Sequence, residues 1–132
     1  MKSFERREKV ARAIQIEIGN MLQKGAIKDD RIDKFVSIVS VNLNSSLSSA
    51  KVGFSILLQS EDDEMNLLEM ASMKAALNDN AGYMRGAIAR KLNLKYAPKI
   101  YFVESESLSK SVDMVDLIDR TVQEDEEKKG LA

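Results

Sequence analysis

The sequence predicts an α+β fold in one domain, with the element order helix, strand, strand, helix, kink, helix, strand. Three observations lead to this prediction. Apolar residues recur at helical spacing in two long stretches, a run of strictly alternating residues lies between them, and the second helical stretch is interrupted by polar residues and a glycine without losing its spacing. A chain of 132 residues can bury one core of this kind without disulfides.

The first helix is predicted over residues 4–24. Its apolar side chains fall on one face of a helix with 3.6 residues per turn: Val10, Ile14, Ile18, Met21 and Leu22. Gly25 suits the left-handed position that closes such a helix. The charged residues 27–33 then predict a loop.

Two strands are predicted next, over residues 35–43 and 50–58. In the second strand, apolar side chains alternate with Lys51, Gly53 and Ser55, a period of two that buries one face. The link over residues 44–49 is rich in asparagine and serine, which favour turns. The pair should therefore form an antiparallel hairpin.

A second helix should begin at Ser60, whose hydroxyl can cap the free amides, with Glu61, Asp62 and Asp63 favoured by the positive end of the helix dipole. The helical spacing continues through these residues: Met65, Leu68, Ala71, Ala75 and Leu77. Its methionines, Met65, Met70 and Met73, are expected to fill the core.

A kink is predicted at Asn80, Ala81 and Gly82, because these residues weaken a helix whose spacing resumes at once. The spacing resumes at these residues: Tyr83, Met84, Ala87, Ile88 and Leu92. Pro98 bars further helix, and residues 100–103 predict the third strand.

Beyond the third strand, the apolar side chains of Leu108, Val112, Val115 and Ile118 predict a short final helix. We expect one domain over residues 1–122 and a charged, disordered tail over residues 123–132.

The composition argues against an enzyme. The chain has neither cysteine nor histidine, which removes thiol nucleophiles, imidazole bases and the usual zinc ligands. Ser105 and Ser107 have no histidine base, and no Walker-type phosphate loop is present. We therefore expect no catalytic residues, no metal and no cofactor. The sequence also shows neither a secretory signal nor a run of about 20 apolar residues, which predicts a cytoplasmic protein.

The formal net charge of −1 conceals segments of opposite sign. Acidic residues gather at 61–64 and after residue 112, whereas no acidic residue lies between Asp79 and Glu104. We predict that the following cations contact RNA phosphates, although each is as well explained by a solvated surface: Arg6, Arg7, Lys9, Arg12, Arg31, Arg85, Arg90, Lys91, Lys95 and Lys99. An alternative is a protein-interaction module whose basic patch meets an acidic protein, or which uses the free edge of the hairpin.

Several short stretches, in this order and spacing, resemble a known family: Arg6-Arg7-Glu8-Lys9-Val10, residues 27–31, Ala50-Lys51-Val52, residues 80–85, residues 97–102 and residues 104–107. From about Arg6 to about Ile118 the chain is similar to the ribosome-binding factor A family, which has the type II KH fold. The resemblance implies a three-stranded sheet with the helices on one face. It also implies that the Gly-x-x-Gly loop of ordinary KH domains is absent, and here Gly82 and Gly86 are separated by three residues.

The resemblance further implies a monomeric factor that binds the precursor of the small ribosomal subunit and its rRNA, near ribosomal proteins or other assembly factors, in late rRNA processing and cold adaptation. Three positions depart from the family pattern. Asp30 replaces a proline in the loop, Asn80 makes the bend more polar and larger, and Ser109-Lys110-Ser111 stands where a glycine is frequent.

Overall fold

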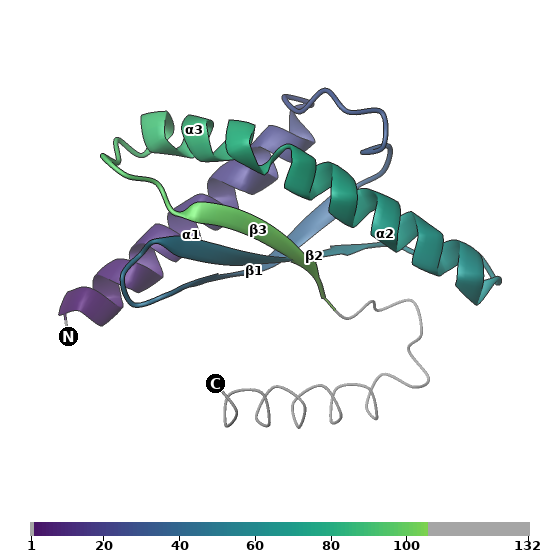
Figure 1. Ribbon diagram of the computed structural model, residues 1–132, viewed down its shortest axis with the longest axis horizontal. Coiled ribbons are helices and arrows are strands. Elements are labelled where there is room, and N and C mark those ends of the chain that lie inside the picture. The colour runs from purple at the N-terminus through teal and green to yellow at the C-terminus, as the bar shows by residue number, and fades with distance from the viewer. Residues whose placement is uncertain (1, 106–132) are drawn as a thin grey trace, which may run out of the picture.

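The computed structural model describes residues 2–105 and has the predicted α+β order (Figure 1). The elements are α1 (Lys2–Gln23), β1 (Val36–Leu43), β2 (Ser49–Ile56), α2 (Asp63–Asp79), α3 (Ala81–Lys91) and β3 (Lys99–Glu104). The predicted final helix and the predicted tail over residues 123–132 lie outside the described residues.

The three strands form one mixed sheet in the order β1-β2-β3. β1 and β2 pair antiparallel, which confirms the hairpin, and β3 lies parallel to β2. In the hairpin turn, the Asn44 side-chain oxygen accepts from the backbone N–H groups of Ser48 and Ser49. The second strand ends two residues earlier than predicted, so Leu57 and Leu58 lie beyond it.

A bulge in β1 determines which side chains enter the core. Ile38 pairs with Phe54 and Ser40 pairs with Gly53, so Val39 has no partner in the register. The extra residue shifts the alternation, and side chains on both sides of it, such as Ile38 and Val41, pack against the same core. Opposite the bulge, a Cβ atom on Gly53 would lie 2.5 Å from Ser40 Oγ, which explains the glycine in a central strand.

The core lies between one face of the sheet and all three helices. Its largest fully buried side chains come from five elements: Ile14, Ile18, Val52, Phe54, Met73, Leu77, Met84, Ile88 and Phe102. The rings of Phe54 and Phe102 meet edge to face, with centroids 6.4 Å apart. Helix packing on one face of the sheet, as the resemblance implied, is therefore confirmed.

The helical spacing did not mark the buried face of α2, although Met70 and Met73 fill the core as predicted. The buried residues of this helix are Asn66, Met70, Met73, Ala76 and Leu77. Of the residues that carried the helical spacing, Leu77 alone is buried, and Met65 does not fill the core. Because α2 carries apolar residues on two opposite faces, spacing did not determine which face meets the sheet.

The start of α2 also differs from the prediction, since the capping residue is Asp62 and not Ser60. Asp62 Oδ1 accepts from the backbone N–H of Glu64 at 2.9 Å. Ser60 lies two residues before the cap, and its Oγ accepts from the backbone N–H of Asp62 at 3.0 Å. The acidic side chains at this helix start therefore have the structural role that the sequence indicated.

Helices α1 and α3 end in the same way, with a left-handed residue and paired backbone hydrogen bonds. Gly25 ends α1 with a φ of 70°, as predicted. Asn93 ends α3 with a φ of 55°, and the N–H of Leu94 donates to the Ala89 carbonyl at 2.9 Å. Helix α3 thus ends at Lys91, next to Leu92, the last residue of the predicted helical spacing, and well before Pro98. Within residues 2–105, no helix combines the length and the apolarity needed to cross a bilayer.

Candidate nucleic-acid interface

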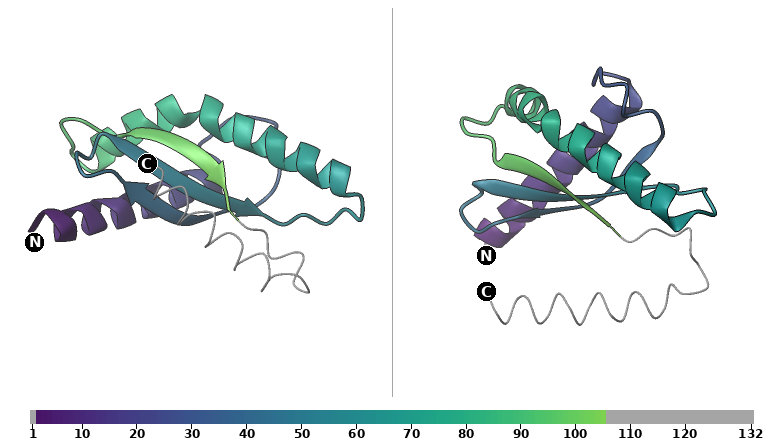
Figure 2. Two further views of the ribbon diagram at one scale, coloured as in Figure 1. Left: turned by 60° about the horizontal axis from the view of Figure 1, so that its bottom comes forward. Right: turned by 45° about the vertical axis from the view of Figure 1, so that its right-hand side comes forward.

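Helices α2 and α3 run end to end and meet at a bend on one residue, Asn80 (Figure 2). The N–H of Asn80 donates to the carbonyls of Ala76 and Leu77, and its own carbonyl accepts from Met84 N–H. Backbone hydrogen bonding therefore continues across the bend. Gly82 lies inside α3 and has no left-handed backbone, so the bend does not depend on the conformational freedom of glycine.

The bend is tied to the loop after α1 by four polar side chains, which we call the Asp29 clasp: Asp29, Arg31, Asp79 and Asn80. Asn80 Nδ2 donates to Asp29 Oδ2 at 2.9 Å. Arg31 donates to both oxygens of Asp29, with Nη2 to Oδ2 at 2.6 Å, and Nη2 also meets Asp79 Oδ2 at 3.0 Å. Bidentate pairing of this kind fixes geometry as well as charge.

The clasp changes the ionisation of its members. Hydrogen bonds from the Arg31 side chain and backbone hold the pKa of Asp29 far below its usual range. The same pairing, first with Asp29 and then with Asp79, raises the pKa of Arg31 above its usual value. Arg31, a predicted RNA contact, is therefore placed in an intramolecular ion pair and contributes to the shape of the loop.

The predicted cations of α1 lie on its first turns, at the end of the molecule where the chain begins (Figure 1). Arg6, Lys9 and Arg12 are exposed, and Arg7 is partly buried. Because α1 begins at Lys2, these cations lie beyond its first turn, and the helix dipole has little effect on them.

Arg90 and Lys91 are exposed on the last turn of α3, where they complement the helix dipole. Together with Ala87, they line a shallow groove against Glu17 and Met21 of α1. Glu17 follows Arg7 by ten residues, or about 15 Å along the helix. The cations of α1 and α3 thus form two separate groups, one on the first turns of α1 and one on the last turn of α3.

The remaining predicted contacts lie in α3, in β3 and in the loop that joins them. Arg85 Nε donates to the Ala97 carbonyl at 3.0 Å, which anchors the connecting loop to α3. Lys95 Nζ lies 5.6 Å from the centre of the Tyr96 ring. Lys99 is exposed at the first residue of β3. Arg85 therefore has a structural partner, whereas Lys99 is available at the surface.

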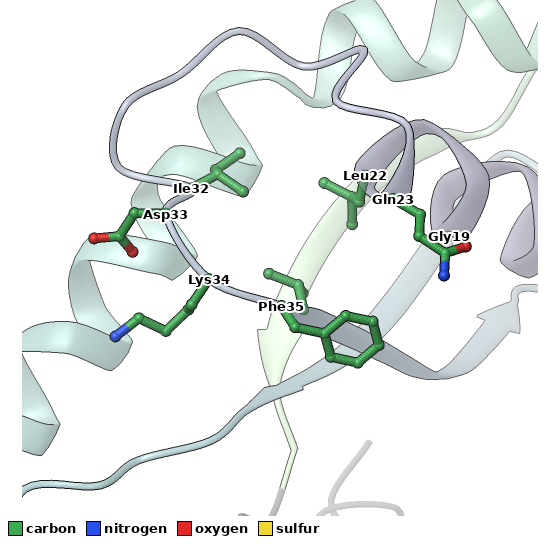
Figure 3. Close-up of a pocket in the computed structure, with 8 residues that line it drawn as sticks. Gly19, Leu22, Gln23, Ile32, Asp33, Lys34 and Phe35 are labelled. Atoms are coloured by element: carbon green, nitrogen blue, oxygen red, sulfur yellow. The ribbon is translucent and has the colours of Figure 1, made fainter.

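A groove between α1 and the start of β1 was not predicted from the sequence (Figure 3). It has a volume of about 310 Å³ and is lined by Gly19, Leu22, Gln23, Ile32 and the exposed ring of Phe35, among others. Gln15 Nε2 donates to the Ile38 carbonyl at 2.9 Å and so occupies one acceptor on the outer edge of β1. The sequence signal that could have indicated this groove is Phe35, an aromatic residue directly after the charged loop.

Chemical groups for catalysis are sparse in the described part of the chain. Within residues 2–105, no three acidic side chains lie close enough together to hold a metal ion. The one carboxyl with a strongly shifted pKa, among the groups described, is Asp29, and its charge is matched by Arg31. The arrangement supports binding through exposed cations around a bent helix pair.

The helix order, the mixed sheet and the bent helix pair define a KH-like domain. The chain belongs to the ribosome-binding factor A family, because the family model described as "Ribosome-binding factor A" matches residues 6–118.

Individual relatives agree with this assignment. A ribosome-binding factor A from Acetivibrio thermocellus is 34% identical over 118 residues, which cover 89% of each chain. The solution structure of a putative ribosome binding factor A from Thermotoga maritima has a TM-score of 0.60 at 28% identity, over 76% of this chain and 88% of that chain. A homology model of the Thermus thermophilus ribosome binding factor A, fitted into the cryo-EM map of a 30S complex, has a TM-score of 0.51 at 19% identity, over 74% of this chain and 89% of that chain. The last comparison supports the fold alone.

Proposed function

We propose that this protein is a non-catalytic assembly factor of the cytoplasm that binds the precursor of the small ribosomal subunit as a monomer. In this proposal, residues 1–122 form the binding domain and contact the small-subunit rRNA. The protein assists late processing of this rRNA and supports adaptation of the cell to cold. Family membership over residues 6–118 supports the proposal, as does the relative fitted into a map of a 30S complex. The observation that carries it is the group of exposed cations on α1 and α3 of a chain from this family.

The cations that best fit phosphate contacts are those with exposed heads on the two helices: Arg6, Lys9, Arg12, Arg90 and Lys91. Arg31 and Arg85 act first on the protein itself, by shaping the loop and anchoring the chain before β3. Contacts of this kind recognise the shape and the phosphates of folded RNA more than its base sequence.

The test is co-sedimentation with purified small-subunit precursors, with the affinity measured between 50 and 200 mM salt. If about five phosphates are engaged, the logarithm of the affinity should fall with the logarithm of the salt concentration at a slope near −3.5 to −4.5. Particles treated with nuclease serve as the comparison. Binding to intact particles with no dependence on salt would overturn the proposal, and retention of a protein partner after removal of the RNA would favour the alternative of a protein-interaction module.

The matched variants are Arg90→Glu/Lys91→Glu and Lys24→Glu/Lys28→Glu, which change the net charge equally. All four side chains are exposed, so both variants should remain folded. The α3 variant should bind more weakly, and its salt slope should be smaller by about 1.4 to 1.8, as expected for two lost phosphate contacts. Equal weakening by both variants would point to net charge alone and remove α3 from the interface.

A further inference from the structure

Helix α2 has a second apolar face that the fold leaves in solvent. We call it the outer α2 strip: Leu67, Leu68, Ala71 and Ala75. Ala71 and Ala75 follow Leu67 by four and eight residues and Leu68 by three and seven, so the four positions form a continuous row about 12 Å long. All four are exposed, and the side chains of Leu67 and Leu68 retain 71% and 61% of their accessible surface. The core of the protein does not use this face, because α2 packs through Met70, Met73 and Leu77.

The surroundings of the strip are acidic. Four consecutive acidic residues, at positions 61–64, are exposed at its N-terminal end. The sequence contains no lysine or arginine between Lys51 and Lys74. Lys34 reaches α2 but pairs with Glu69 at 3.0 Å, and helical geometry places Glu69 on the opposite side from Ala71. The strip therefore combines exposed apolar surface with four acidic residues at its N-terminal end, and Lys74 is the one cation within its span.

The strip lies far from the cations proposed to bind rRNA. Helix α2 begins at one end of the molecule, whereas α1 begins and α3 ends toward the other (Figure 1). An RNA backbone that approached residues 61–64 would meet like charge. Exposed apolar surface beside a group of like charges is typical of a protein interaction site, with a partner of opposite charge.

Two protein segments could occupy the strip: residues 106–132 of this chain or a segment of another protein. Charge decides between them. Residues 106–132 of this chain contain eight acidic and four basic side chains, so their net charge has the same sign as the rim. A cationic segment of another protein would complement it. The small residues Ala71 and Ala75 leave room for a close approach beside the two leucines, and the row matches about two turns of a helix.

We propose that the outer α2 strip docks a cationic, amphipathic protein segment of the ribosomal particle. The contact adds apolar area at the end of the molecule opposite to the rRNA contacts. This proposal rests on the proposed function, because it takes its partner from the same particle. It predicts two chemically different attachments, one through phosphates and one through apolar side chains.

The first experiment places the photo-crosslinking residue p-benzoylphenylalanine at Leu68 of the full chain and, as a control, at Tyr101 on the open face of the sheet. Both sites are exposed. Each protein is bound to purified small-subunit precursors, irradiated and digested with nuclease. At position 68, we expect a nuclease-resistant adduct with a ribosomal protein, mapped by mass spectrometry to a segment of net positive charge. At position 101, we expect no such adduct.

The second experiment measures the affinity of Leu67→Ser/Leu68→Ser, with Tyr101→Ser as the control. The strip variant should bind about tenfold more weakly, with an unchanged salt slope and a thermal midpoint close to that of the unmodified protein. The slope distinguishes this loss from that of a phosphate contact, which would reduce it.

The outcomes separate this proposal from the one on which it rests. Failure of the unmodified protein to co-sediment would overturn the proposed function, and this inference with it. If the unmodified protein binds, two results at position 68 overturn the docking site alone. One is an adduct with RNA or with residues 106–132 of the same chain, and the other is the absence of any adduct. Unchanged affinity of the serine variant would do the same.

Discussion

The side-chain amide of Asn80 donates to the Asp29 carboxylate at 2.9 Å, although the two residues are 51 positions apart in the sequence. The same nitrogen lies 2.8 Å from the Ala76 carbonyl at the end of α2. One side chain therefore ends a helix and holds the loop that follows α1. This relationship gives a physical role to the larger, polar residue at a bend where the family pattern has a small one.

Replacement of Asn80 by alanine should lower the free energy of unfolding by about 1 to 2 kcal/mol, because two hydrogen bonds of a half-buried amide are lost. Denaturation by urea, at pH 7 and constant salt, measures the change. Asn42→Ala, at an exposed position of β1, is the control. A double-mutant cycle with Asp29→Asn should show coupling between the two positions, and strict additivity would argue against the contact.

The contribution of the Asp29 clasp to the stability of the protein should depend on pH. The pKa of Asp29 is lower in the folded protein than its unfolded value of about 3.9, so its stabilising contribution is complete above that value and is lost as the pH falls through the folded pKa. Asp29→Asn lacks this titration. The difference in stability between the two proteins should therefore be constant from pH 7 to about pH 5 and should shrink below about pH 4. Thermal unfolding followed by circular dichroism across this range tests the prediction, and a difference that grows in acid would contradict it.

Gly82→Ala should stabilise the protein by about 0.5 to 1 kcal/mol, since Gly82 lies in helical backbone and a Cβ atom there meets no atom within 4 Å. Co-sedimentation should be unchanged if the bend itself provides the binding shape. Weaker binding by a more stable protein would show that the particle approaches Gly82 closely. Gly19→Ala, at a half-buried position of α1 where a Cβ atom would also meet no atom within 4 Å, is the control.

Gly53→Ala should lower the free energy of unfolding by about 1 to 3 kcal/mol, because its Cβ atom would lie 2.5 Å from Ser40 Oγ. Ser40→Ala removes that oxygen and leaves a Cβ–Cβ distance of 3.8 Å, an ordinary contact. The double variant Ser40→Ala/Gly53→Ala should therefore recover most of the loss in a urea titration. No recovery would mean that the backbone of β2, and not the Ser40 side chain, requires the glycine.

The sequence predicted best the elements whose signals were local and strong. The spacing in α1, the closing glycine at position 25, the hairpin and the interruption at Asn80 all reappear in the structure. The bulge in β1 was missed, although the adjacent apolar residues Ile38 and Val39 break the alternation there. The predicted spacing in α3 stops at Leu92, which is the C-cap, but the left-handed Asn93 that follows it was not predicted.

The candidate site was harder to predict because charge can be counted along a sequence but pairing cannot. Arg31 and Arg85 resemble their neighbours in the sequence, and folding gives each of them a partner. The two apolar faces of α2 were equally ambiguous, since either one satisfied the helical spacing. Which face meets the sheet depends on the position of β3, and a local pattern carries no information about that position.

The pairing of β3 with β2 has a consequence for synthesis. Phe54 is synthesised 48 residues before its ring partner Phe102, which belongs to the last strand of the described chain. Helix α1 and the hairpin can form while the chain is still growing, yet one side of the central strand has no neighbour until residues 99–104 have been made. The apolar face of the sheet therefore closes only after residues 99–104 have been synthesised.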